Sequence, residues 1–387
     1  MKILFASDIS FKNLQGYNEQ SAINCMKNTA EFFKKADFSV LNLENVFGNK
    51  DELTPIIKSG PNLISTADYL GYINILRPSV IGLSNNHTGD FGEEAIDYTL
   101  NVLKKNGYNF IGVGKNITEA YKPALFEKDN VKVAVIAVCE NEFGIAEDDK
   151  CGASGYRLSL VTKSINDARK KGYLPIIFFH GGNEINPFPS PGKKELYRHF
   201  IDLGAASVIA MHTHCPQGYE IYNGAPIIYS MGNFFFPYDE NLQNKSWFYG
   251  YMTELSITCD DIKLQIIPYK FDFNNHTVLS GDEKDEFMKY IEYINKPILD
   301  DKLLKKYFDA WCVMLGINCY SVHVVYKDTM PENGASEVSA TKNIFSCEAH
   351  NELITHMLKL IYDGRVKEAE EKICEIKILQ KLQIPEH

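Results

Sequence analysis

Two apolar segments of this chain end abruptly in histidine. Residues 175–179 lead into His180, and residues 208–211 lead into His212 and His214. Short apolar runs rich in β-branched and aromatic residues predict buried strands, and the carboxyl ends of parallel strands meet at one edge of a sheet. Histidines at i and i+2 on an extended segment face the same side. Because imidazole is a common metal ligand, the pattern predicts a metal site at a sheet edge, with core packing as the alternative for any single histidine.

Other predicted strands also end in side chains that can bind metal. Residues 3–7 lead to Asp8, residues 38–43 to Glu44, and residues 80–84 to Asn86 and His87. Helical patterns lie between them; residues 93–105 have apolar side chains at helical spacing and are followed by Gly107, a typical helix stop. Strands that alternate with helices predict an α/β fold.

The composition restricts the partners of the chain. Its 387 residues are 45% hydrophobic, enough for a large core. A formal charge of −10 argues against nucleic acid or an anionic membrane as the partner. Nine cysteines without a C-x-x-C pair favour free thiols in a reducing compartment. The first strand reaches Asp8 too early for a signal peptide or an integral membrane segment, so we expect a cytoplasmic protein.

The pattern changes in the C-terminal third. Residues 254–257 and 263–268 alternate like antiparallel strands. From near Gly281 the chain is charged and helical over residues 283–315 and 345–382, with a polar stretch at 327–343. We therefore predict two parts. Residues 1–275 form the α/β domain, and residues 276–387 form a mainly helical appendage for packing, homodimerisation or docking to a partner protein.

The strand-end residues stand in motifs that recur together in one protein family. In chain order the motifs are Asp8, Asn42-Leu43-Glu44, Asn85-Asn86-His87-Thr88 with Asp90, His180-Gly181-Gly182-Asn183-Glu184, His212 and His214 with Gln217, and Tyr229-Ser230 with Gly232-Asn233-Phe234. This series resembles the CapA family of bacterial capsule or poly-γ-glutamate biosynthesis proteins, a branch of the calcineurin-like metallophosphatases. The resemblance covers about residues 1–275 and implies a four-layer α/β/β/α sandwich with a dinuclear metal site at the strand ends.

The resemblance also implies a role for each motif residue. Asp8 and His214 correspond to ligands of a first metal, Asn86, His180 and His212 to ligands of a second, and Glu44 to a carboxylate that bridges both. His87 corresponds to the residue that donates a proton to the leaving oxygen or stabilises the phosphoryl charge. Carboxylate, amide and imidazole donors favour two divalent ions, with Mn preferred and Fe or Zn also suitable. Such ions lower the pKa of a shared water, so that hydroxide is present near neutral pH.

The chain departs from metallophosphatases at large on its first strand, where Asp8-Ile9-Ser10 replaces Asp-x-His. The first metal therefore loses the histidine of that motif and keeps His214. Either Ser10 or a water completes its shell, or the first site is weak or empty.

Further polar residues are candidates for the substrate pocket or for contacts that orient the ligands. Asp90 and Glu184 are candidate carboxylates beside the histidines. Lys58 is a candidate contact for an anionic substrate, Asn233 for the pocket lining, and Gln217 for the pocket rim. Each of the five has a structural alternative: a surface residue, a solvated lysine or a turn asparagine.

These observations predict a metal-dependent hydrolase that acts on a phosphoester or related anionic substrate in capsule or surface-polymer biosynthesis. A metal-activated water is the expected nucleophile and His87 the expected general acid. One alternative is a non-catalytic capsule-assembly or polymer-binding subunit with a degraded metal site. Another is a metal-dependent enzyme for γ-glutamyl amide bonds.

Overall fold

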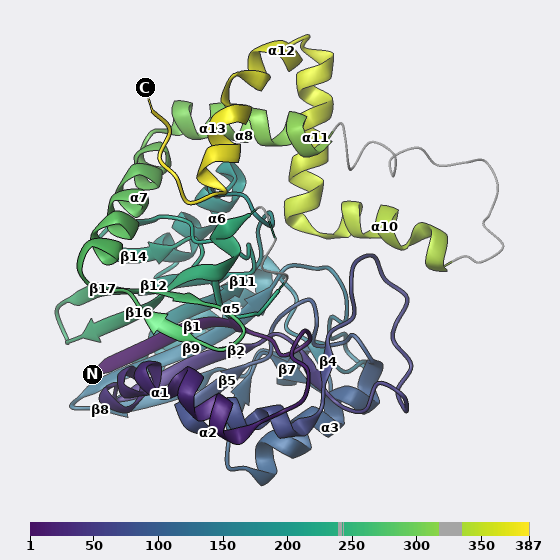
Figure 1. Ribbon diagram of the computed structural model, residues 1–387, viewed down its shortest axis with the longest axis vertical. Coiled ribbons are helices and arrows are strands. Elements are labelled where there is room, and N and C mark those ends of the chain that lie inside the picture. Colours follow the sequence, from purple (N-terminus) through teal and green to yellow (C-terminus); the bar gives the residue numbers. More distant parts are fainter. Residues whose placement is uncertain (239–241, 243, 317–334, 387) are drawn as a thin grey trace.

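Two β-sheets stacked face to face form the centre of the molecule (Figure 1). The computed structural model describes residues 1–238, 242, 244–316 and 335–386. The first sheet has the strand order β18-β17-β16-β1-β2-β5-β6, with β15 beside the end of β1. Its strands are β1 (Lys2–Ile9), β2 (Phe38–Leu43), β5 (Val80–Gly82), β6 (Asn109–Ile111), β15 (Asn233–Phe235), β16 (Tyr249–Ile257), β17 (Ile262–Phe271) and β18 (His276–Val278).

The second sheet has the order β13-β14-β12-β11-β9-β8. Its strands are β8 (Ala124–Lys128), β9 (Val131–Cys139), β11 (Leu174–His180), β12 (Ser207–Met211), β13 (Tyr219–Tyr222) and β14 (Ala225–Ile228). Two short ribbons pair β3 (Val46–Phe47) with β4 (Ile64–Ser65), and β7 (Val113–Gly114) with β10 (Gly152–Ala153).

Both sheets have a parallel centre, and this feature positions the site. β1, β2, β5 and β6 run parallel in the first sheet, and β9, β11, β12 and β14 run parallel in the second. β16, β17 and β18 are antiparallel, as the alternating pattern predicts. The carboxyl ends of the parallel strands therefore point to a common edge.

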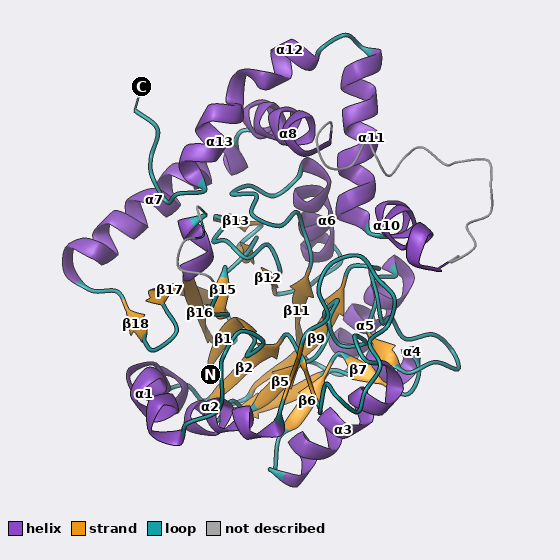
Figure 2. Cartoon of the chain, turned by 45° about the vertical axis from the view of Figure 1, so that its right-hand side comes forward, coloured by secondary structure: helices purple, strands orange, loops and turns teal. Residues whose placement is uncertain are grey.

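Helices cover the outer face of each sheet (Figure 2). On the first sheet these are α1 (Glu19–Lys35), α2 (Leu70–Leu76) and α3 (Gly92–Lys105), and on the second α5 (Leu158–Lys170) and α6 (Pro191–Asp202). Short turns of helix lie in the connections: η1 (Ala67–Tyr69), α4 (Ile117–Ala120) and η2 (Lys245–Phe248). α6 begins where Ser190 accepts a hydrogen bond from the N–H of Lys193 and Pro191 takes the first helical position.

Three layers of buried side chains hold these four layers of structure together. Successive residues of β1 face opposite sides, so Phe5 packs between the sheets, with its ring 5.9 Å from that of Phe178. Its neighbour Leu4 packs under the helices of the first sheet. Ile177 of β11 faces the helices of the second sheet. The arrangement confirms the predicted α/β/β/α sandwich.

The C-terminal residues form the predicted helical appendage. Its helices are α7 (Gly281–Leu299), α8 (Asp301–Leu315), α10 (Ala335–Ser346), α11 (Glu348–Tyr362), α12 (Val366–Ala369), η4 (Glu370–Lys372) and α13 (Ile373–Leu379). Side chains such as Phe287, Trp311 and Leu353 join the same hydrophobic cluster as the space between the sheets. The polar stretch predicted at 327–343 is partly α10, and residues 327–334 lie outside the described residues.

The sequence predicts free thiols and no integral membrane segment. The described cysteines carry free thiols, and Cys319 lies outside the described part of the chain. In the part that the structure describes, each helix is too short or too polar to span a bilayer.

Candidate metal centre

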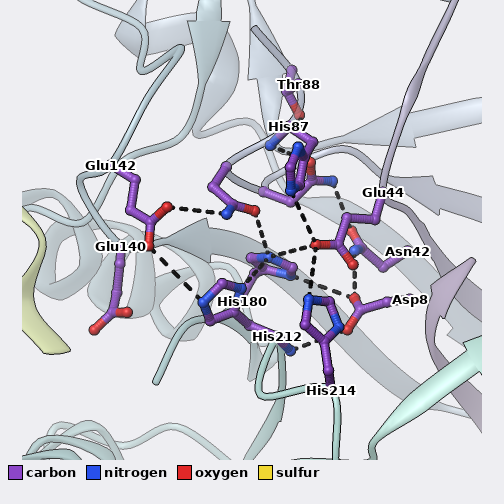
Figure 3. A network of polar contacts seen from close by, with 12 residues as sticks. Asp8, Asn42, Glu44, His87, Thr88, Glu140, Glu142, His180, His212 and His214 are labelled. Carbon is purple, nitrogen blue, oxygen red and sulfur yellow. Dashed lines mark hydrogen bonds and ion pairs between the residues drawn. The ribbon is translucent and has the colours of Figure 1, made fainter. Parts of the chain in front are cut away.

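The strand ends of both sheets bring the predicted donors to one place (Figure 3). Asp8 lies near the end of β1, and Glu44 follows β2 directly. His180 ends β11 in the second sheet, and His212 and His214 follow β12. All five side chains are buried. The site therefore forms where the carboxyl edges of the two sheets meet.

Two sets of ligand atoms in this group are close enough to hold an ion each. Asp8, Glu44 and His214 form one set, and Glu44, His180 and His212 form the other, with the atoms of each set within 4.8 Å of one another. Glu44 belongs to both sets: its Oε1 lies 3.6 Å from Nε2 of His180 and 3.9 Å from Nε2 of His214. The structure thus brings together the residues expected at the first and second metals, with Glu44 between them.

Asn86 joins the second set. Its Oδ1 lies 3.1 Å from Nε2 of His180, and that nitrogen lies 3.0 Å from Nδ1 of His212. Amide oxygen and imidazole nitrogen are acceptable ligands for the same divalent ion. All six residues predicted as ligands therefore meet at this edge.

Glu44 provides the test of whether these donors fit a cation. Both of its carboxylate oxygens are buried without a hydrogen-bond partner, and so is Nδ1 of His180. Burial, together with the carboxylate of Asp8, raises the pKa of Glu44 well above its usual value. A buried carboxylate without donors is unfavourable unless a cation compensates it. The donor set fits a divalent metal.

The turn after β12 is held in an unusual backbone conformation. His212 has φ of 98° and His214 has φ of 53°, both in the left-handed region. For residues other than glycine this conformation costs about 1–3 kcal/mol and is found mainly at functional sites. The N–H of His212 donates to Oδ2 of Asp8 at 3.1 Å. The turn therefore connects the second sheet to the first at the site.

Two asparagines orient the donors. The amide of Asn42 donates to Oδ1 of Asp8 at 2.7 Å, and Oδ1 of Asn233 lies 2.8 Å from Nδ1 of His214. Asn233 is fully buried and contacts the ring nitrogen of His214 that faces away from Glu44. It was predicted to line the pocket, but its contact is with a candidate ligand.

His87 lies beside the donors, within a small charged network. Its Nδ1 lies 2.7 Å from Oδ2 of Asp90, and its Nε2 lies 3.8 Å from Oε1 of Glu44. Lys58 forms an ion pair with Asp90 and lies 3.2 Å from Nδ1 of His87. Burial lowers the pKa of His87 to about 4. The ring is therefore neutral near pH 7. Its Nδ1 faces the carboxylate of Asp90, and its Nε2 faces Glu44.

A cavity of about 580 Å³ opens above this network. Lys58, Asn86, His87 and Glu142 line its wall on the sandwich side. The appendage contributes Trp311, Met314, Leu315, Asn343, His350 and Gln380 to the same cavity. The two parts of the chain thus enclose one space next to the candidate metal centre.

Two candidates remain. Glu184 is exposed and lines the cavity, and its role of orienting a histidine stays a prediction. Gln217 is buried, and its amide donates to the carbonyl of Asn186 at 2.8 Å. That contact gives Gln217 a structural role in the loop instead of the predicted position at the pocket rim.

Sequence reasoning missed Glu140 and Glu142, which follow β9 in the second sheet. Oε2 of Glu142 accepts from the amide of Asn86 at 3.0 Å, and Oε1 lies 3.9 Å from Nε2 of His212. Glu140 forms a buried ion pair with Lys193. The sequence did contain a signal for these two residues, because the mostly apolar residues 131–139 predict a strand that Glu140 and Glu142 follow. The appendage residues around the cavity carried no comparable signal.

Comparison with known proteins identifies the family of this arrangement. Residues 2–238 match the family model described as "Bacterial capsule synthesis protein PGA_cap". The capsule biosynthesis protein CapA of Bacillus anthracis is 28% identical over 164 residues, which are 41% of this chain and 40% of that protein. The PGA biosynthesis protein CapA of Bacillus subtilis (strain 168) is 25% identical over 207 residues, 53% of this chain and 54% of that protein. This chain spans about half the length of the curated relatives it matches.

Among solved structures, a hypothetical protein from Thermus thermophilus aligns with a TM-score of 0.44 at 11% identity. The alignment covers 70% of this chain and 99% of that protein.

Proposed function

This chain belongs to the CapA family of bacterial capsule synthesis proteins, a branch of the metallophosphatase-like superfamily, and from that premise we propose that it is a metal-dependent hydrolase of an anionic substrate in capsule-polymer synthesis. The single observation that supports this proposal most strongly is the position of Glu44. Its buried carboxylate lacks hydrogen bonds and is shared by two sets of candidate ligands. Such a carboxylate is costly to keep unless it binds cations.

The residues around the proposed centre have separate tasks. Divalent ions bound there would supply Lewis acidity, polarising a phosphoryl oxygen and lowering the pKa of a water. Glu44 would hold the two sites at a fixed separation. His87 would act at the leaving oxygen through Nε2, because Asp90 occupies Nδ1. An anionic substrate next to Nε2 would raise the pKa of His87 from about 4 and let the ring carry the proton.

The cavity restricts the proposed substrate. A volume of about 580 Å³ accommodates a small phosphate ester or the end of an anionic polymer. Lys58 lies beside His87 but is paired with Asp90. Bound divalent ions would therefore supply the positive charge that favours an anion in spite of the net charge of −10 of the whole chain. We propose Mn as the preferred metal because the donors are carboxylate, amide and imidazole.

The test measures metal content and hydrolysis together. The protein is purified without chelator, its metal is counted per chain, and mono- and bis-aryl phosphates are assayed with added Mn. We expect Glu44→Gln, which keeps the shape of the side chain, to lose metal and activity together. His87→Ala should keep the metal and lower kcat by about 10²–10⁴-fold. His199→Ala, a change of an exposed histidine on α6, is the matched control and should change neither.

Two results would contradict the proposal. Wild-type protein that binds divalent metal but hydrolyses no aryl phosphate would favour a γ-glutamyl amide-bond enzyme, if γ-glutamyl peptides are cleaved in the same preparation. Protein that retains substoichiometric metal and cleaves neither substrate would favour a non-catalytic assembly or polymer-binding subunit.

A further inference from the structure

A second cluster of metal-binding side chains lies at the joint between the sandwich and the appendage. Glu142 follows β9, Cys347 precedes α11, and His350 is in the first turn of α11. One ligand atom of each lies within 4.8 Å of those of the other two. Cys347 is fully buried, and the side chain of Glu142 is 7% exposed. These residues are not among those predicted from the sequence.

The distances in this cluster suit a coordinated ion. Sγ of Cys347 lies 3.5 Å from Oε1 of Glu142. A tetrahedral zinc ion with bonds of about 2.3 Å to sulfur and about 2.0 Å to oxygen places those two atoms about 3.5 Å apart. On the far side of the cluster, the amide nitrogen of Asn343 lies 3.3 Å from Nδ1 of His350.

The surroundings of the cluster carry an excess of buried negative charge. Glu140, Glu142 and Glu348 lie together there, and Lys193 pairs with Glu140. Glu348 accepts two hydrogen bonds from Asn141, at 2.9 Å and 2.6 Å. A divalent cation at the cluster would offset this charge, and its binding would release the thiol proton of Cys347.

We propose that Glu142, Cys347 and His350 form a further divalent-metal site, separate from the strand-end centre and selective for zinc-like ions. Its thiolate donor distinguishes it, because soft sulfur ligands favour zinc over manganese. Glu142 and His350 also line the cavity, so the cavity provides an entry path and an open position for a fourth ligand. The site fastens α11 to the loop after β9, next to the candidate ligands Asn86 and His212. It does not depend on the protein being a hydrolase.

The test uses a spectroscopic signal that the strand-end centre cannot give. Metal-free full-length protein is titrated with Co²⁺ or Cd²⁺, and the near-ultraviolet thiolate-to-metal charge-transfer band is recorded. We expect a band whose amplitude corresponds to one thiolate–metal bond per chain and that disappears in Cys347→Ala. His350→Ala should retain the band but need more metal to saturate it, by at least the roughly 10–100-fold that loss of a partner orienting a ligand costs. Zn²⁺ should raise the Tm of the wild type and have a smaller effect on both variants.

Matched controls separate this site from other sites. Cys259 is exposed, so Cys259→Ala should keep the band. Glu44→Gln should also keep it, although it removes the proposed bridging carboxylate, so failure of the strand-end centre is distinguishable from failure of this site. Absence of the band in the wild type, or its persistence in Cys347→Ala, would show that the thiol is only a hydrogen-bond donor to the carboxylates. If Cys347→Ala does not fold, an unchanged titration of His350→Ala overturns the proposal.

Discussion

Oδ1 of Asn233 lies 2.8 Å from Nδ1 of His214. The amide nitrogen of Asn233 donates to the carbonyl of Trp247 at 3.1 Å, so the amide oxygen faces the imidazole and accepts a hydrogen bond from its Nδ1–H. This contact leaves Nε2 of His214 as the free nitrogen, 3.9 Å from Oε1 of Glu44. β15 carries Asn233 beside Asp8 in the ladder with β1. The pairing of these two strands thus fixes the tautomer of a candidate ligand.

Removing that acceptor should weaken metal binding without removing a ligand. We expect Asn233→Ala to lower the affinity of the strand-end centre by about 10–100-fold, the usual effect of losing a partner that orients a histidine. Asn233→Asp keeps an acceptor for Nδ1 and should retain more affinity than the alanine variant. Competition with a chromophoric chelator measures both. Equal affinity in Asn233→Ala and the wild type would show that the contact does not orient the ligand.

Asp90 should act through His87 and not through the metal. Asp90 accepts from Nδ1 of His87 and from the N–H of Leu63, at 2.7 Å and 2.6 Å. Asp90→Asn should lower kcat by about 10²–10⁴-fold, the range of a general acid–base contribution, and leave the metal content unchanged. In a double-mutant cycle on aryl phosphate hydrolysis, adding Asp90→Asn to His87→Ala should cause little further loss. Additive losses would indicate that Asp90 acts independently of His87.

Gly89 and Gly144 should be sensitive to the addition of a single methyl group. A Cβ on Gly89 would lie 2.4 Å from the Cα of Gly144, so the two loops touch backbone to backbone. Gly89→Ala should lower the free energy of unfolding by about 1–3 kcal/mol, as overpacking does. It should also weaken metal binding, because these loops carry His87 and Glu142. Denaturant titration and metal titration give the two values.

Gly92 provides the control for that steric effect. It has φ of +71°, and a Cβ added at this position would meet only open space. Gly92→Ala should therefore cost only the backbone strain, about 1–2 kcal/mol, with metal affinity unchanged. If both variants lose metal affinity equally, the contact between the loops is not the cause.

His276 should make the fold sensitive to acid. Its ring is buried between Phe234 and Tyr269, accepts from the hydroxyl of Thr29 and donates to the carbonyl of Phe234. Burial lowers its pKa from 6.5 to about 3. The unfolded chain therefore binds a proton at His276 more readily than the folded protein does. The contribution of the neutral ring to the free energy of unfolding is complete above pH 6.5 and is lost as the pH falls toward 3, at about 1.4 kcal/mol per pH unit.

His276→Gln isolates this contribution, because glutamine can make both hydrogen bonds and does not titrate. The free energy of unfolding, measured by denaturant titration at several pH values, should fall less steeply in the variant than in the wild type below pH 6.5. Parallel curves for the two proteins would assign the acid sensitivity to other groups.

The sequence alone determined the class of the fold and the donors at the strand ends. Strands and helices have local signatures, in the spacing of apolar residues and in glycine stops. Asp8, Glu44 and His180 each follow an apolar run, and parallel strands end at a common edge, so a local pattern was enough to predict that their side chains meet. The family resemblance added the division of the donors between two metals.

Tertiary structure alone decided what surrounds those donors. Cys347 and Glu142 are separated by 205 residues, and no local pattern specifies that α11 returns to the loop after β9. Likewise, the contact of Asn233 with His214 depends on the pairing of β15 with β1. Helix packing and strand pairing across long separations depend on the shape of the whole core, which a window of sequence does not contain. The strand-end donors were therefore predictable. The cavity, the appendage residues that line it and the second metal-binding cluster were decided by how the appendage folds back onto the sandwich.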